Sequence, residues 1–416
     1  MNKIKSKSLS IFLAFVMLCT FVPTVNLTAD AAVIAGFEAS GDTAYYNMHN
    51  QGIFTVRAFE DPVNQTNPIR HFAKGCFVGD KAWGITFSDG HLSLRDYSIT
   101  DSDFLINVTI SSTINLIGEG VFSNCRSLQN IIVVSNNPHF SSVGGVLYNK
   151  NRTKLIKYPE GKKGKSFIIP STVTEIGKGA FSRLRILENL TIPASVKTIA
   201  NDAFDDFGSI RNINVNSKNN NFSSVSGVLF NKTKRNLIKY PAGKTATKYT
   251  VPKNVTTIGS YAFYENSKIK EVTLPSSART IDDYAFVRCT SLVRLSIPKG
   301  VKTIRPAAFL APNKNLFIRT SRNSTAHKLA TSRGWNVILT NVKRRITFRN
   351  GKRTAKRYNI EHNELLTAKQ RNYKIKKKGF KFGGWYADSK FKRKFNFKQR
   401  ITKNHTVYAK FTKNKK

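Results

Sequence analysis

Residues 281–298 read IDDYAFVRCTSLVRLSIP, and this arrangement of apolar residues returns along the middle of the chain. An isoleucine is followed five residues later by a phenylalanine at 117/122, 176/181, 199/204, 258/263, 281/286 and 304/309. Successive phenylalanines lie 59, 23, 59, 23 and 23 residues apart. A 23-residue unit therefore repeats, and two of the units carry an insertion of 36 residues.

The two insertions are copies of each other. Residues 140–149 read FSSVGGVLYN and residues 222–231 read FSSVSGVLFN, and LIKYP occurs at 155–159 and again at 237–241. Equivalent positions keep the same separation throughout, which equals the length of one long and one short unit together. This constant register indicates a duplicated structural unit rather than chance similarity.

Each unit contains a short strand and a segment that turns back. In 292–298 the apolar side chains of Leu295 and Ile297 share one face of a strand, which Pro298 ends because it lacks a donor. One unit is too small to bury its own apolar face, whereas stacked units share a core. Each buried Ile, Leu or Phe then contributes about 1.5–3 kcal/mol. The repeat predicts a solenoid that is mainly β, with short helical turns.

Two units, 117–128 (IGEGVFSNCRSL) and 281–292 (IDDYAFVRCTSL), resemble the BspA-like leucine-rich repeats of bacterial surface proteins. The inserted GVLYNK and LIKYP segments are similar to those of the same family. The resemblance covers residues 105–340. It implies a leucine-rich-repeat solenoid with a parallel sheet on one face, β-hairpins inserted between repeats, a role in adhesion or recognition, and no catalytic residues.

The ends of the solenoid need cover, because an open end would expose the apolar core. Residues 323–335 predict a short closing helix, capped by Asn323 or Ser324, with Leu329 and Ala330 facing the core. Residues 32–104 match no motif, and we expect an N-terminal cap or a small leading domain there.

Four cysteines give no disulfide framework. Cys125 and Cys289 occupy the same position of their repeats, where other copies have Leu184, Phe207 and Asn266. We expect both to be buried core residues, too many repeat steps apart to form a disulfide.

The N-terminus has the three parts of a secretion signal. Lysines at 3, 5 and 7 precede an apolar run at 9–22, and Ala29-Asp30-Ala31 follows as an A-x-A site. The run is shorter than the roughly 20 residues that span a membrane. We therefore predict a signal peptide over residues 1–31, cleaved between Ala31 and Ala32. The mature chain is expected at the cell surface or cell wall, with no transmembrane span and no intracellular nucleic acid as partner.

The chain is strongly basic, with 68 Lys and Arg against 24 Asp and Glu and a net charge of +44. Residues 341–416 alone carry 26 Lys and Arg against three acidic residues. Strand-like aromatic runs there, such as KGFKFGGWYADS and HTVYAKF, resemble the Listeria–Bacteroides repeat of internalin-type surface proteins. The resemblance implies a small β-grasp-like module with Trp385 and Tyr386 in its core.

Two sets of residues are candidate binding sites. The basic cluster of the C-terminal module is the candidate site for an anionic cell-wall polymer: Lys374, Lys376, Lys377, Lys378, Lys390, Lys392, Arg393 and Lys394. The outward strand positions of the solenoid are the candidate face for an extracellular protein or glycan: Glu188, Asn189, Thr191, Lys270, Glu271, Thr273, Arg294 and Ser296.

Common catalytic signatures are missing from the sequence: it contains no H-E-x-x-H, G-x-S-x-G or C-x-x-C. His71 and Cys76 form the one pair that could include a nucleophile, and lone aspartate pairs such as Asp205-Asp206 are too few for calcium. We expect no catalytic site, metal or cofactor. The leading hypothesis is a secreted surface binding protein. A structural wall-associated spacer, or an enzyme with its site in residues 32–104, remains as an alternative.

Overall fold

Short strands that recur at the spacing of the sequence repeat build most of the chain in this computed structural model. It describes the backbone of residues 11–18, 24–40, 43–46, 52–56, 71–72, 82–87, 89–90, 92–310 and 312–414, with side chains from Trp83 onward. The chain divides into two units. Unit 1 consists of Met1–Thr245, Ile258–Ser267 and Asp283–Arg288, and unit 2 of Ala246–Thr257, Lys268–Asp282 and Cys289–Lys416.

Parallel pairing at the repeat spacing begins early in unit 1. The strands concerned are β6 (Ala82–Phe87), β8 (Asn107–Ile110), β10 (Asn130–Val133), and in a second row β7 (Ser93–Leu94) and β9 (Leu116–Ile117). Val108, for example, pairs with Ile131, the equivalent position of the next repeat. The repeat thus extends back to residue 82, before the expected start at 105. Leu94 and Ile99, both fully buried, replace the isoleucine and phenylalanine of the motif there, which hid the unit in the sequence.

Five strands precede these: β1 (Ile11–Leu18), β2 (Thr24–Ser40), β3 (Thr43–Tyr46), β4 (Gly52–Val56) and β5 (His71–Phe72). The expected cleavage site between Ala31 and Ala32 lies within β2. Residues 1–10 and 19–23 of the predicted signal peptide lie outside the described residues. Cleavage would remove β1 and also residues 24–26, which pair with β4.

Each insertion forms an antiparallel hairpin and a returning strand. These are β11 (Phe140–Val143), β12 (Val146–Asn149) and β13 (Lys154–Lys157), then β19 (Phe222–Val225), β20 (Val228–Asn231) and β21 (Asn236–Lys239). Phe140 pairs with Asn149, and the second hairpin repeats this register at Phe222 and Asn231. The expected inserted hairpins are confirmed.

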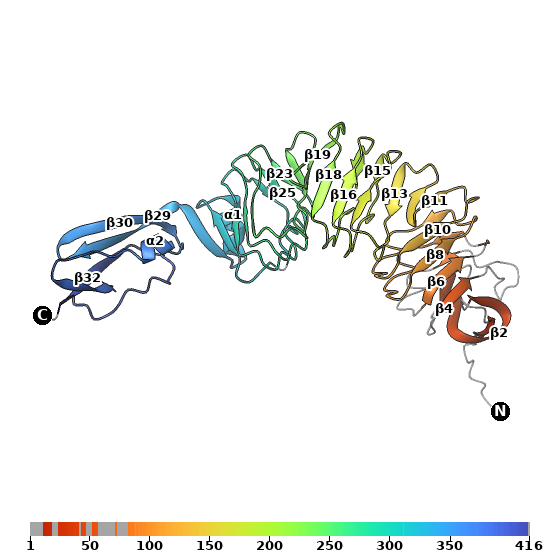
Figure 1. Cartoon of the computed structure of the whole chain (residues 1–416), viewed down its shortest axis with the longest axis horizontal. Helices are drawn as coiled ribbons and strands as arrows, with labels where there is room; N and C mark the ends of the chain where they lie inside the picture. Colours follow the sequence, from red (N-terminus) through yellow and green to blue (C-terminus); the bar gives the residue numbers. More distant parts are fainter. Residues whose placement is uncertain are drawn as a thin grey trace, which may run out of the picture. The chain divides into compact units, whose positions relative to one another are not determined.

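Between the insertions, two further rows of parallel strands continue unit 1, as Figure 1 shows. One contains β14 (Ser166–Ile168), β16 (Asn189–Ile192) and β18 (Asn212–Val215), and the other β15 (Glu175–Ile176) and β17 (Thr198–Ile199) beside β13.

The core of unit 1 is a stack of apolar side chains from successive units. The rings of Phe181 and Phe204 lie 5.8 Å apart at 21°, and Phe207 stacks on Phe181 at 6.1 Å and 9°. All three rings are buried, so each unit lends apolar surface to its neighbours. Cys125 and Cys289 are both buried, as the comparison of repeats predicts.

Unit 2 contains further strands of the repeat and the closing helix. Its strands are β22 (Lys248–Thr250), β24 (Glu271–Thr273), β25 (Thr280–Ile281), β26 (Arg294–Ser296), β27 (Thr303–Ile304) and β28 (Phe317–Thr320), while β23 (Thr257–Ile258) lies at the division. Helix α1 (Thr325–Ser332) begins at Ser324, whose hydroxyl accepts the His327 N–H. Ala330 is buried as expected, with Ala326, whereas Leu329 is half-buried.

The C-terminal module forms a small sheet around an aromatic core. It contains β29 (Asn336–Asn350), β30 (Arg353–His362), α2 (Ala368–Arg371), β31 (Phe380–Tyr386) and β32 (His405–Lys413). Trp385 and Tyr386 are buried, as expected, and Trp385 donates its indole N–H to the Tyr373 carbonyl at 2.6 Å. Among the residues that the structure describes, no helix is long and apolar enough to cross a membrane.

Candidate functional site

The polar row predicted on the strands of unit 1 consists of cross-strand pairs. Asn189 accepts a hydrogen bond from the Asn212 amide at 3.0 Å, one repeat further on. Glu188 bridges Lys165 and Arg211 at 3.1 and 3.4 Å, and the hydrogen bond from Lys165 lowers its pKa. These side chains, together with half-buried Thr191, form an ordered polar surface rather than independent groups.

The predicted face in unit 2 divides into free and occupied positions. Lys270 and Thr273 are exposed, Ser296 is half-buried, and Glu271 pairs with Lys248 at 3.2 Å. Arg294 instead forms two parallel hydrogen bonds of 3.1 Å with the carboxylate of Glu364 in the C-terminal module. The expectation that Arg294 faces a ligand is therefore wrong: a bidentate bond to the module uses its guanidinium.

A second arginine of the solenoid strands is bound by the same module. Arg319 donates to both carboxylate oxygens of Glu361 at 2.9 and 2.7 Å, and Lys343 adds a contact at 3.3 Å. The Arg400 guanidinium lies 3.5 Å from the centroid of the Phe317 ring. Two of the three acidic residues of the module thus hold it to the last solenoid strands.

The eight basic residues predicted to bind an anionic polymer are all exposed, but the module separates them into two groups. Lys377 forms a β-bridge with Phe380 at the start of β31, and Lys394 forms one with Tyr386 at its end. Seven residues at about 3.3 Å each put these ends roughly 20 Å apart. Such spacing suits an extended polymer better than a single small anion.

The second basic group lies on an ordered loop. The Asp388 carboxylate accepts backbone N–H bonds from Lys390, Lys392 and Arg393 at 3.0–3.1 Å. The bonds from Lys392 and Arg393 lower the pKa of Asp388 and keep it ionised. The one remaining carboxylate of the module therefore organises the loop that presents these cations.

Sequence reasoning missed a groove of about 330 Å³ in unit 1. Its sides are the turns 117–123 and 177–183, and β13 of the first insertion contributes Lys154, Ile156 and Lys157 between them. The two turns contain four glycines, and half-exposed Tyr97 lies at one side. Asp202 and Asp205 of the following turn complete the lining.

The three lysines of this groove are already paired with carboxylates. Lys178 reaches across from one turn to Glu119 on the other at 2.6 Å, and Lys154 contacts Glu175 at 2.6 Å. Lys157 is nearly buried and donates to Glu160 at 3.3 Å and to the Ser182 hydroxyl at 3.1 Å. In a chain of net charge +44, the groove is a locally balanced polar site.

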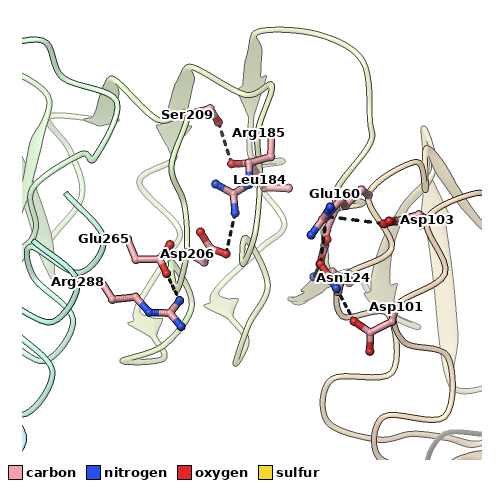
Figure 2. Close-up of polar contacts among 12 residues, drawn as sticks. Asp101, Asp103, Asn124, Glu160, Leu184, Arg185, Asp206, Ser209, Glu265 and Arg288 are labelled. Atoms are coloured by element: carbon pink, nitrogen blue, oxygen red, sulfur yellow. Dashed lines mark hydrogen bonds and ion pairs between the residues drawn. The ribbon is translucent and has the colours of Figure 1, made fainter. Parts of the chain in front are cut away.

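A ladder of polar residues lies two positions after Ile99 and after the motif phenylalanines from Phe122 to Phe286. Its members share a left-handed backbone conformation: Asp101, Asn124, Arg183, Asp206, Glu265 and Arg288. Figure 2 shows Arg185 contacting Asp206 at 3.0 Å and Arg288 contacting Glu265. Burial, and then a hydrogen bond to Glu265, raise the pKa of Asp206 to about 7. The Asp206 carboxyl is therefore partly protonated near neutral pH.

The structure does not describe the side chains of the remaining candidate pair, His71 and Cys76. Cys76 lies outside the described residues, and of His71 only the backbone, in β5, is described. Within the described part of the chain, no three His, Cys, Asp or Glu side chains are grouped so that they could hold a metal ion.

Comparison with protein families follows the same division of the chain. The sequence model of the BspA type leucine-rich repeat region matches six copies over residues 58–153, 159–246 and 240–328, more than half of the chain. The chain belongs to the BspA-type leucine-rich repeat family. This BspA-type protein also matches the Listeria-Bacteroides repeat domain over residues 345–410. The first repeat match begins within the segment for which sequence analysis expected a cap or leading domain.

Solved structures include several bacterial relatives of this BspA-type chain. A leucine-rich repeat protein from Eubacterium ventriosum ATCC 27560 has 23% identity and a TM-score of 0.45, covering 70% of each chain. A leucine rich cell surface protein from Faecalibacterium prausnitzii A2-165 has 18% identity and a TM-score of 0.43, covering 82% of this chain and 95% of the other. Pneumococcal vaccine antigen PcpA has 18% identity and a TM-score of 0.35, covering 79% and 96%. No curated protein matches the chain.

A position-by-position comparison of the two long repeat units could have revealed the groove of the BspA-type solenoid from the sequence. Gly179 and Ser182 of the first copy correspond to Tyr261 and Tyr264 of the second. Small residues replaced by two large ones at equivalent turn positions indicate space in one copy that is filled in the other.

Proposed function

We propose that this chain is a surface-associated binding protein whose solenoid recognises an extracellular protein or glycan. BspA-type proteins are typically surface-associated, and their repeat fold is in general not enzymatic. The observation that supports the proposal best is the ordered polar surface of β16 and β18, where Glu188 and Asn189 are positioned by cross-strand partners. A pre-positioned polar surface loses little side-chain entropy on binding.

Binding by the solenoid is tested with the purified full chain on arrays of matrix proteins and glycans. A Glu188→Ala and Thr191→Ala double variant should lose binding at least about tenfold if these strands form the contact. A matched pair of exposed positions elsewhere in unit 1, Lys218→Ala and Lys234→Ala, serves as the control. Equal binding by all three proteins would favour a spacer role over recognition.

The C-terminal module is proposed to attach the protein to an anionic polymer of the cell wall, such as teichoic acid. Its support is the concentration of cations, 26 Lys and Arg against three acidic residues, two of which face solenoid arginines. Polyanion binding of this kind releases counterions, so attachment should weaken as salt rises.

A charge-matched pair of variants tests this attachment. In the first, all eight predicted residues from Lys374 to Lys394 are changed to Gln. The second changes eight exposed solenoid lysines to Gln and loses the same charge: Lys163, Lys197, Lys218, Lys234, Lys253, Lys299, Lys302 and Lys328. We expect the first variant alone to be released from isolated walls at low salt. Equal retention of both variants, or retention of the wild type in 1 M salt, would refute the assignment.

A further inference from the structure

We propose that the groove between turns 117–123 and 177–183 of unit 1 binds a neutral saccharide. The inference rests on the proposed recognition role and specifies for it a ligand class and a place distinct from the strand surface. Its volume of about 330 Å³ lies at the lower end of the ~300–1,000 Å³ range of small-molecule sites, enough for a short sugar segment.

The balance of charge argues for a neutral ligand. Each lysine of the groove has a carboxylate partner within 3.3 Å, as in the contacts of Lys178 with Glu119 and of Lys157 with Glu160. An anionic ligand that bound these lysines would have to displace their carboxylates, and a cationic one that bound Glu119 or Glu160 would have to displace the lysines. Sugar hydroxyls both donate and accept hydrogen bonds, so they can bridge existing ion pairs without adding a charge.

Unused hydrogen-bonding capacity in the groove points the same way. Asp205 lines it, and its Oδ1 is buried without a hydrogen-bond partner, so a turn of the carboxylate about its Cβ–Cγ bond would present an unsatisfied acceptor to a ligand hydroxyl. Lys157 uses two of its three N–H donors on Glu160 and Ser182, which leaves one for a ligand. A buried acceptor without a partner weakens a fold, so a ligand that supplies a donor would remove that cost.

An aromatic side chain completes the requirements of a sugar site. The Tyr97 ring is 39% exposed and packs over Gly120, where a Cβ would approach its Cε1 to 2.3 Å. An exposed aromatic surface beside paired polar groups suits a pyranose ring, which has apolar C–H faces and hydroxyl edges. The groove offers both kinds of contact, supplied by successive turns of the solenoid.

The second insertion shows how the same space is filled when no groove is formed from these positions. Tyr261 and Tyr264 replace Gly179 and Ser182, and their rings contact each other at 5.4 Å. Burial raises the pKa of Tyr261, with a further contribution from Asp205 and its stacking neighbour Tyr284. The tyrosine ring therefore lies near the residue that corresponds to Ser123 on the facing turn of the first copy.

The experiment measures binding of the full chain to immobilised neutral oligosaccharides by glycan array, followed by calorimetry with the best soluble one. The array includes mammalian-type neutral glycans and neutral bacterial polysaccharide fragments, which separates the two possible sources. Sialylated, uronic and sulfated sugars and a peptide library are printed beside them. We expect neutral sugars to bind, with little change between 0.1 and 0.5 M salt.

Two groove variants connect binding to the site. Asp205→Ala removes the unpartnered acceptor and should weaken sugar binding at least about tenfold while leaving the unfolding midpoint equal or higher. Gly179→Tyr with Ser182→Tyr transplants the pair of the second copy, whose Tyr261 adopts the same positive φ. It should abolish binding. Asp103→Ala, an exposed aspartate outside the groove, is the matched control.

Unchanged sugar binding in both groove variants would overturn the proposal. So would an array on which only acidic sugars or only peptides bind. If the groove variants lose the sugar but keep attachment to walls and matrix proteins, the recognition role stands independently of the groove. If the wild type binds sugar but no cell surface or matrix, the groove assignment stands and the adhesive role fails.

Discussion

Lys157 and Lys239 occupy the same position of the two insertions, and both are nearly buried. Lys157 is bonded to the buried Glu160 carboxylate, whereas the second copy has Ala242 there and Lys239 donates to the Tyr261 carbonyl at 3.1 Å. Removing Lys157 leaves a buried carboxylate without its cation, which costs about 3–5 kcal/mol. We expect Lys157→Met to lower the free energy of unfolding by this amount in urea titrations at pH 7.

Two further variants make the origin of that loss clear. Glu160→Ala copies the second insertion and should cost far less than Lys157→Met. Lys154→Met removes only an exposed pair with Glu175 and should change stability by about 0.5 kcal/mol or less. Because burial raises the pKa of Glu160, the penalty in Lys157→Met should shrink as pH falls and the carboxyl gains a proton. A pH-independent loss would contradict the ion-pair explanation.

Asp206 gives the fold a pH dependence of its own. Burial and the Glu265 carboxyl raise its pKa from 3.8 to about 7, so the folded chain binds this proton more tightly than the unfolded chain. The contribution of this proton to the free energy of unfolding is fully present below about pH 4 and is lost as the pH rises through 7. Asn124, the equivalent residue of the first copy, cannot ionise. We expect Asp206→Asn to be more stable than the wild type by about 1–2 kcal/mol at pH 8 and equal to it near pH 4.

The measurement is a pair of urea titrations at each pH, and parallel pH profiles for wild type and variant would contradict the raised pKa of Asp206. Two exposed arginines flank the pair. Arg185 contacts Asp206 and opposes the rise in its pKa, whereas Arg288 contacts Glu265 and lowers the pKa of that carboxyl. Asp101→Asn, at an exposed ladder position, is the control and should leave the profile unchanged.

Single residues differ in how far the sequence alone could place them. Burial of Cys125 and Trp385 was predictable, because each stands at an apolar position of a recognisable pattern. The Asp206–Glu265 pair was not, since its members belong to different repeats and meet only if the long unit adds a hairpin without breaking the ladder. The unpartnered oxygen of Asp205 likewise depends on side-chain geometry that a spacing rule does not contain.

Each inserted hairpin starts at a buried asparagine, Asn137 or Asn219. The amide of Asn219 donates to the Pro193 and Val196 carbonyls of the preceding unit at 2.8 and 2.9 Å. Its oxygen accepts the N–H groups of Asn221 and Phe222 at 2.8 Å. Asn219→Asp keeps the acceptor and loses both donors, so two carbonyls face a buried carboxylate. We expect a loss of about 2–4 kcal/mol and faster hydrogen exchange in β19 and β20.

Asn221→Asp is the control for this element, because its amide makes an exposed bond to the Lys197 carbonyl. It should leave exchange in the second hairpin within twofold of the wild type. If Asn219→Asp unfolds the chain globally without a preceding local loss of protection in β19 and β20, the asparagine stabilises the solenoid as a whole and does not specifically anchor the hairpin.

At the scale of elements, repeat period and duplication predicted the strands, both hairpins and the closing helix. Strands β6 and β7 were missed because Leu94 and Ile99 preserve the burial of the motif without its letters. The boundary expected at residue 340 falls inside β29, which pairs with β28 over residues 336–339 and with β30 mainly over 343–350. Charge changes abruptly at that point while the strand continues, so the change of module between the two family matches falls within one strand.

Across the molecule, positive charge is spread unevenly, and the module that carries most of it must still pack against basic strands. Arg294 and Arg319 meet the Glu364 and Glu361 carboxylates, which converts a repulsive contact into two bidentate ones. Without these two pairs, strand β29 would be the main connection between the module and the solenoid strands. We expect Arg294→Ala with Arg319→Ala to accelerate hydrogen exchange in residues 361–367 by at least about tenfold, because each such bond is worth roughly 1.5–3 kcal/mol.

The matched control removes two exposed cations from the same unit, Lys302→Ala with Lys328→Ala, and lowers the net charge equally. Long-range charge repulsion, rather than the two bidentate arginine–glutamate pairs, could govern how the module packs on the solenoid strands. In that case both variants should slow hydrogen exchange in residues 361–367, and 0.5 M salt should do the same. If the two bidentate pairs hold the module, only the arginine variant alters the hydrogen-exchange rate of these residues, and it raises that rate. The two explanations therefore predict opposite signs at the same residues, and one exchange experiment at two salt concentrations decides between them.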